Sequence, residues 1–106
     1  MTRPSRVTVG PFVVRIIGGD PAVGMLDAGD AGCYDHLRGT IAVRDGLAPL
    51  PEREVVVHET LHVATEVAGL RDELGDEKEE AVVRRLAPVV LDILRRNPRL
   101  VEYLVG

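Results

Sequence analysis

Residues 55–62 read Val-Val-Val-His-Glu-Thr-Leu-His, and they lie within a segment, Glu52 to Ala68, whose pattern predicts one long helix. Pro51 suits the first turn of this helix, where a backbone N–H has no helical partner, and Gly69 suits its end. Upstream, Gly, Pro and Asp interrupt short β-branched runs, whereas downstream the pattern is helical. Strands first and helices after predict an α+β fold, in which a small, mostly antiparallel sheet precedes this helix and a C-terminal helix.

The segments before the helix have the composition of short strands. The predicted strands are Val7 to Val9, Phe12 to Ile17, Gly32 to Asp35 and Thr40 to Arg44. The last two form the arms of a predicted hairpin, with His36 to Gly39 as its turn. Val23 to Asp27 is a further strand candidate.

Three features are expected after the long helix. Arg71 to Asp76 reads as a polar loop, and Glu77 to Arg96 reads as a second helix. Pro88 lies inside that helix and is expected to kink or split it, because proline lacks the N–H that a helix interior needs. Leu100 to Leu104 is expected to form one last helical turn.

Composition narrows the class of protein. A chain of 106 residues fits one domain, spanning 1–106. Its formal net charge of −4 disfavours a nucleic-acid partner, because phosphate binding needs a basic surface. Cys33 is the one cysteine, so no intramolecular disulfide forms, which suits a reducing compartment. No signal peptide and no membrane-spanning run is apparent, and we expect a cytoplasmic protein without a membrane partner.

The histidines of the opening stretch have the spacing of a metal site. Residues four apart on a helix lie one turn apart on the same face, so His58 and His62 can bind one metal ion together. Glu59 lies roughly 100° around the helix, where it can contact a water on that metal. The pattern predicts a zinc centre with His58 and His62 as ligands and Glu59 as a general base.

A zinc site of this kind needs a third protein ligand and one open position. With Glu79 placed at 0° on its predicted helix, the mean direction of Val82, Val83 and Leu86 lies close to it, so Glu79 faces the core. A buried carboxylate gains from a metal, and Glu79 is therefore the preferred third ligand, with Glu80 as the alternative. Asp76 and Glu79 also have capping-box spacing, which would use Glu79 at the helix start instead.

The motif His58-Glu59-Thr60-Leu61-His62, followed by Glu79 and the stretch from Ala81 to Pro88, resembles the gluzincin side of the zincin-like metallopeptidases. More narrowly, the chain is similar to very short metallopeptidase-like proteins encoded by actinobacterial phages and prophages. ImmA/IrrE-like and SprT-like peptidases would be more distant relatives. The resemblance covers roughly residues 32–104.

The resemblance implies a zinc peptidase that acts on a protein or peptide substrate, in the host cytoplasm if the chain is phage-encoded. Larger gluzincins have an Asp four residues after the ligand Glu, where this chain has Val83. The partners that orient the histidines are then expected elsewhere, with Glu66, Asp76 and Glu80 as candidates. The chain also lacks a large second lobe. Either substrate affinity is low or a partner, such as a second copy or a phage or host protein, completes the site.

Peptide cleavage needs a donor for the attacked carbonyl oxygen. Tyr34, His36 and Tyr103 have suitable chemistry. An extended substrate is expected to pair with the edge of the strand Thr40 to Arg44. The competing hypothesis is a non-catalytic zinc-binding module that serves in interaction or phage assembly.

Overall fold

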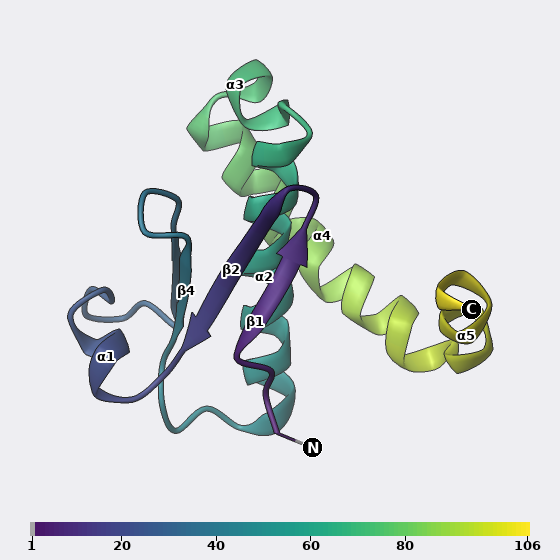
Figure 1. Ribbon diagram of the computed structural model, residues 1–106, viewed down its shortest axis with the longest axis horizontal. Coiled ribbons are helices and arrows are strands. Elements are labelled where there is room, and N and C mark those ends of the chain that lie inside the picture. Colours follow the sequence, from purple (N-terminus) through teal and green to yellow (C-terminus); the bar gives the residue numbers. More distant parts are fainter. Residues whose placement is uncertain (1) are drawn as a thin grey trace.

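The first half of the chain forms a four-stranded mixed sheet, seen in a computed structural model that describes residues 2–106 (Figure 1). The strands are β1 (Arg6–Val9), β2 (Phe12–Ile17), β3 (Gly32–Asp35) and β4 (Thr40–Val43). Their order in the sheet is β1-β2-β4-β3. The β1–β2 and β3–β4 pairs are antiparallel and the β2–β4 pair is parallel, so the predicted mostly antiparallel sheet is confirmed.

The sheet order corrects one expectation about the edge of the sheet. β4 pairs with β2 on one side and with β3 on the other, so Thr40 to Val43 is a central strand with no free edge. The four residues of β4 are all buried, which suits a central strand. The edge beside the hairpin turn belongs to β3 instead.

The segment after β2 was expected to include a strand from Val23 to Asp27, and this prediction is wrong. A short helix, α1 (Asp20–Val23), occupies the beginning of this segment. Asp45 accepts a hydrogen bond from the backbone N–H of Gly19 at 2.9 Å, and Pro21 lies in the first turn of α1. Proline favours the start of a helix, and the residues between α1 and β3 belong to no strand of the sheet.

The long helix α2 (Pro49–Val67) packs against one face of the sheet, starting three residues before the predicted segment. Val63 on α2 meets a core of β-branched side chains from the strands. These are Val14, Ile16, Ile41 and Val43. With one Phe, two Tyr and no Trp in the chain, the core consists of closely packed aliphatic groups.

Beyond α2 the chain is helical to its end. The expected loop from Arg71 to Asp76 is wrong, because α3 (Leu70–Leu74) fills most of it and Asp76 is already the first residue of α4 (Asp76–Arg96). Gly69 has φ +74°, a left-handed conformation that ends α2 and lets a new helix turn begin at once. Pro88 lies inside α4 without dividing it.

The last helix, α5 (Pro98–Val105), extends the predicted final turn in both directions. Figure 1 shows α4 crossing behind α2 and then projecting away from the sheet, with α5 at its far end. Within residues 2–106, no helix combines the length and the apolar character needed to cross a membrane.

Candidate metal centre

Helix α2 places both motif histidines on one face. His58 Nε2 and His62 Nε2 lie 3.2 Å apart, and their ring centroids are separated by 5.0 Å. Two nitrogens bound to one tetrahedral zinc at about 2.0–2.1 Å would lie roughly 3.3 Å from each other. The two rings thus converge as a shared metal requires. Burial lowers the pKa of His58, which favours the neutral ring that binds metals.

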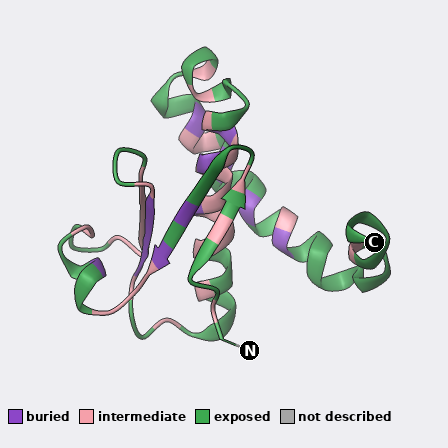
Figure 2. Ribbon diagram, viewed as in Figure 1, coloured by how far each residue is buried: buried purple, intermediate pink, exposed green. Residues whose placement is uncertain are grey.

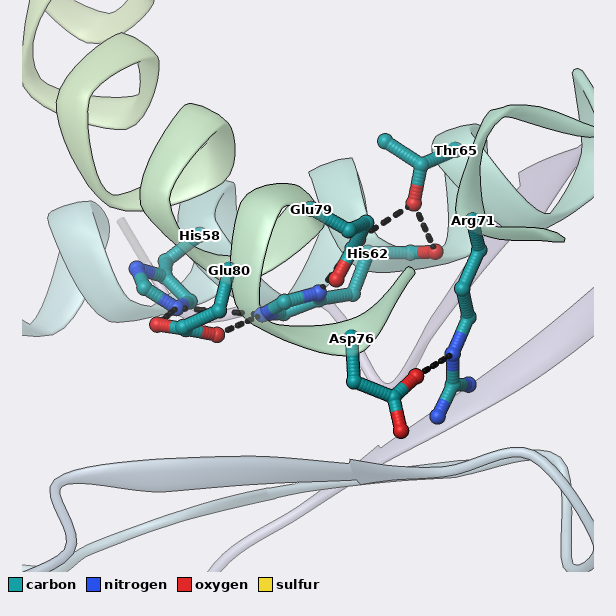
Figure 3. Close-up of polar contacts among 7 residues, drawn as sticks. All are labelled: His58, His62, Thr65, Arg71, Asp76, Glu79 and Glu80. Atoms are coloured by element: carbon teal, nitrogen blue, oxygen red, sulfur yellow. Dashed lines mark hydrogen bonds and ion pairs between the residues drawn. The ribbon is translucent and has the colours of Figure 1, made fainter. Parts of the chain in front are cut away.

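Two consecutive glutamates reach these rings from the first turns of α4 (Figure 3). Glu80 contacts the nitrogens that face each other, with Oε1 3.2 Å from His58 Nε2 and Oε2 2.7 Å from His62 Nε2. Glu79 contacts the opposite side of the second ring, with Oε2 2.7 Å from His62 Nδ1. The two carboxylates therefore lie on different nitrogens of His62.

Glu79 is 3% exposed, so the prediction that it faces the interior is confirmed. The neighbours used to predict this behave differently, because Val83 is buried while Val82 and Leu86 are exposed. The capping-box alternative is wrong, since Gly75 precedes α4 and no side chain caps the helix. The Glu79 carboxylate points to α2 instead.

Thr65 is a member of this cluster that was not predicted from the sequence. Its hydroxyl donates to Glu79 Oε2 and also lies 2.9 Å from the carbonyl oxygen of His62. Thr65 follows His62 by three residues on α2, so it lies on the same helical face. That spacing was the signal that could have identified it. The hydroxyl helps to hold the Glu79 carboxylate against the ring.

Glu59 lies beside the two histidines and is 6% exposed. Burial raises the pKa of Glu59 to about 7, since a charged carboxylate is poorly solvated there. Strand β3 closes over this side chain. A Cβ added to Gly32 would lie 2.5 Å from Val55 Cγ1 and 3.5 Å from Glu59 Cγ, so only glycine permits the approach of β3 to α2.

Two adjoining cavities open on this cluster. The polar cavity has a volume of about 490 Å³, and its lining includes the two histidines, Glu59, Glu79 and Glu80. The second, of about 350 Å³, shares His58, Glu59 and Gly32 with it and is lined in addition by Ala31, Pro51, Glu54 and Val55. The shared lining residues place a polar cavity and a more apolar cavity side by side at the cluster.

Only one of the three expected donors to the carbonyl oxygen lines the polar cavity. Tyr34 on β3 lines the polar cavity, whereas neither His36 nor Tyr103 does, and Tyr103 is 82% exposed on α5. Arg71, which sequence reasoning assigned to a loop without a role, lines the same cavity from α3. Of the candidates for orienting a histidine, Glu80 contacts both rings, while Asp76 pairs with Arg71.

The arrangement can hold a metal ion. Two overlapping groups share His62, one with His58 and Glu59 and the other with Glu79 and Glu80, and within each group the ligand atoms lie within 4.8 Å of one another. Comparison of the chain with known protein families, with curated proteins and with solved structures finds no match. The function of the chain must therefore be inferred from the geometry of this cluster.

Proposed function

We propose that the protein is a zinc-dependent peptidase of the zincin-like, gluzincin type. The observation that carries this proposal is the convergence of His58 Nε2, His62 Nε2 and the Glu80 carboxylate, with the buried Glu59 beside them. Two imidazoles and a carboxylate suit Zn²⁺. A purely structural zinc site would have no use for a buried base beside it.

The contacts favour Glu80 as the third ligand. Its two oxygens face the same nitrogens, of His58 and His62, that converge on each other. Glu79 instead contacts Nδ1 of His62, where a carboxylate typically orients a metal-binding ring and makes it a stronger ligand. We therefore assign Glu79, held by Thr65, to positioning His62.

Zinc, when bound, would supply a water that deprotonates near neutral pH and would polarise the scissile carbonyl. The residues of the chain do the rest. Glu59 takes a proton from the attacking water and passes it to the leaving amine, a role suited to a buried carboxylate beside both histidines. The more apolar cavity, beside Ala31 and Val55, would accommodate an apolar side chain of the substrate next to the scissile bond.

The test combines metal analysis with peptide cleavage. Protein purified without chelators should contain one zinc per chain and should cleave a mixed peptide library, detected by mass spectrometry. Glu59→Gln should keep the zinc and lose cleavage, because only the proton transfer is removed. Glu77→Gln, on the exposed side of α4, is the matched control and should retain both.

The competing function is a non-catalytic zinc-binding module for interaction or phage assembly. It is favoured by the apolar surface of α5, where Tyr103, Leu104 and Val105 are each more than half exposed. The same experiment decides between the two functions. A wild-type protein that binds zinc but cleaves no peptide, and a Glu59→Gln variant that behaves identically, would establish the module.

A further inference from the structure

The polar cavity is lined by more negative than positive side chains. Five carboxylates line it: Asp30, Glu59, Asp76, Glu79 and Glu80. Arg71 is the only arginine or lysine side chain among the described residues that line it. Negative charge that develops on a reacting group in such surroundings is repelled, and a fixed cation nearby offsets this repulsion.

Arg71 lines the polar cavity from helix α3. The left-handed turn at Gly69 reverses the chain after α2, and Arg71 is the second residue of α3. Figure 3 shows its side chain extending toward the sheet, with the guanidinium beside Asp76. The Nε–Oδ1 distance of 3.4 Å makes this a long contact, and the Asp76 side chain is 88% exposed.

Most of the donors of this guanidinium remain available. An arginine has five N–H groups. Within residues 2–106, Asp76 is the one side chain that forms an ion pair or a hydrogen bond with Arg71. The Arg71 side chain is 38% exposed, so it lines the cavity while remaining accessible to a bound molecule.

We propose that Arg71 is a catalytic residue that donates hydrogen bonds to the carbonyl oxygen of the scissile peptide bond. This inference rests on the proposed peptidase function. When the oxygen of water bonds to the carbonyl carbon, the C=O π electrons move onto the carbonyl oxygen, which becomes negative. When the C–N bond breaks, those electrons re-form the carbonyl and the amine receives its proton from Glu59. Arg71 keeps its protons throughout and stabilises the charged stage.

Tyr34 is the rival donor on the same cavity, and its surroundings disfavour it. Burial and the neighbouring Glu66 carboxylate raise the pKa of Tyr34 to about 12, so its hydroxyl is a weaker acid than an ordinary tyrosine. A cationic guanidinium is the stronger donor toward an oxygen that becomes negative.

The test separates binding of the tetrahedral, negatively charged reaction stage from binding of the unreacted substrate. Zinc-loaded wild type, Arg71→Gln and Arg71→Lys are titrated with a phosphinic dipeptide isostere bearing leucine side chains, which presents a tetrahedral, negatively charged group. The matched probe is the hydroxamate of the same peptide, which binds metal through a planar group. Arg38→Gln, on the hairpin turn outside the cavity, is the control for loss of a positive charge.

Arg71→Gln should weaken binding of the phosphinic probe about 100-fold and change hydroxamate binding less than about threefold, with kcat lowered about 100-fold at nearly constant KM. Arg71→Lys should be intermediate, and Arg38→Gln should match wild type. Zinc content and circular dichroism report whether each variant is folded.

Equal effects of Arg71→Gln on the two probes, or no effect on either, would overturn the assignment of Arg71. So would a zinc-loaded wild-type protein that binds no phosphinic probe. Tight, Arg71-dependent binding of that probe by a protein that cleaves no peptide has a different meaning. That result would refute the peptidase function while supporting the contact made by Arg71.

Discussion

Residues 76–91 and residues 92–105 of the C-terminal helices have similar apolar content but opposite surroundings. In residues 76–91, which we call the packed end of α4, there is a stripe of buried residues at four-residue intervals that packs on α2: Glu79, Val83, Ala87 and Leu91. Beyond this stripe, residues 92–105, which we call the arm, contain no buried residue. Figure 2 shows this change from purple bands to green along α4 and α5.

This difference shows that packing against another segment, here α2, decides which side chains are buried, and that the apolar pattern of the helix does not. Ile93 and Leu94 on the arm are each 42% exposed, whereas Leu91, just before them on α4, is 9% exposed. The packed end is also where the site lies, because Glu79 and Glu80 reach the histidines only when α4 is held against α2. On the arm, no segment within residues 2–106 buries the apolar side chains, so they stay at least partly exposed.

The largest expected effect is on metal binding at the packed end of α4. Glu80→Gln should lower zinc affinity more than about 100-fold, because a ligand loses its charge, whereas Glu79→Gln should lower it about 10- to 100-fold through the orientation of His62. Competition with a chromophoric zinc chelator measures both affinities. Glu77→Gln should bind zinc like wild type. The reverse order of the first two variants would identify Glu79 as the ligand and Glu80 as its support.

The next effect concerns the buried carboxylate that faces this end of α4. Burial raises the pKa of Glu59 from 4.5 to about 7 in the metal-free fold. The folded protein therefore binds a proton more tightly than the unfolded chain, and the associated stability is complete below pH 4.5 and is lost as pH rises to about 7. Glu59→Gln should escape this loss.

Metal-free Glu59→Gln should accordingly be more stable than metal-free wild type at pH 8 by about 3 kcal/mol. Urea denaturation of both proteins between pH 5 and 8 is the measurement. Parallel stability curves over this range would show that Glu59 titrates normally. Both proteins must be free of zinc, because a bound cation would itself favour the carboxylate.

A smaller difference should separate two valines of the same helix. Val83→Ala removes two methyl groups from a side chain that is 1% exposed, and it should lower the free energy of unfolding by about 2 kcal/mol. Val89→Ala, at a half-exposed position, should change it by less than about 0.5 kcal/mol. Equal losses in chemical denaturation would show that the exposed side of α4 is covered in solution.

The smallest expected effect is that of shortening the arm. A chain that ends at Arg96 lacks α5, and its unfolding free energy and zinc affinity should stay within about 0.5 kcal/mol of wild type. Denaturation at two protein concentrations, with size-exclusion chromatography, checks this. A large and concentration-dependent loss of stability would mean that α5 packs against a second copy.

Much of the fold was predictable because its signals are local. The hairpin from Gly32 to Val43 and the helix after Pro51 follow from turn residues and periodicity over a few positions. The strand predicted from Val23 to Asp27 and the loop predicted from Arg71 to Asp76 were wrong. In both places a short helix forms next to a glycine with positive φ, a conformation that the identity of glycine permits but does not require.

The candidate site likewise has one part that local sequence predicted and another that it did not. His58, Glu59 and His62 belong to one helix, so the sequence by itself determined that the two rings share a face, with the glutamate between them in the chain. The choice between Glu79 and Glu80 depends on the rotation of α4 against α2, and the position of Arg71 depends on the turn at Gly69. Only the tertiary structure decided these, because helix packing and chain reversal are set by contacts between segments that sequence spacing does not encode.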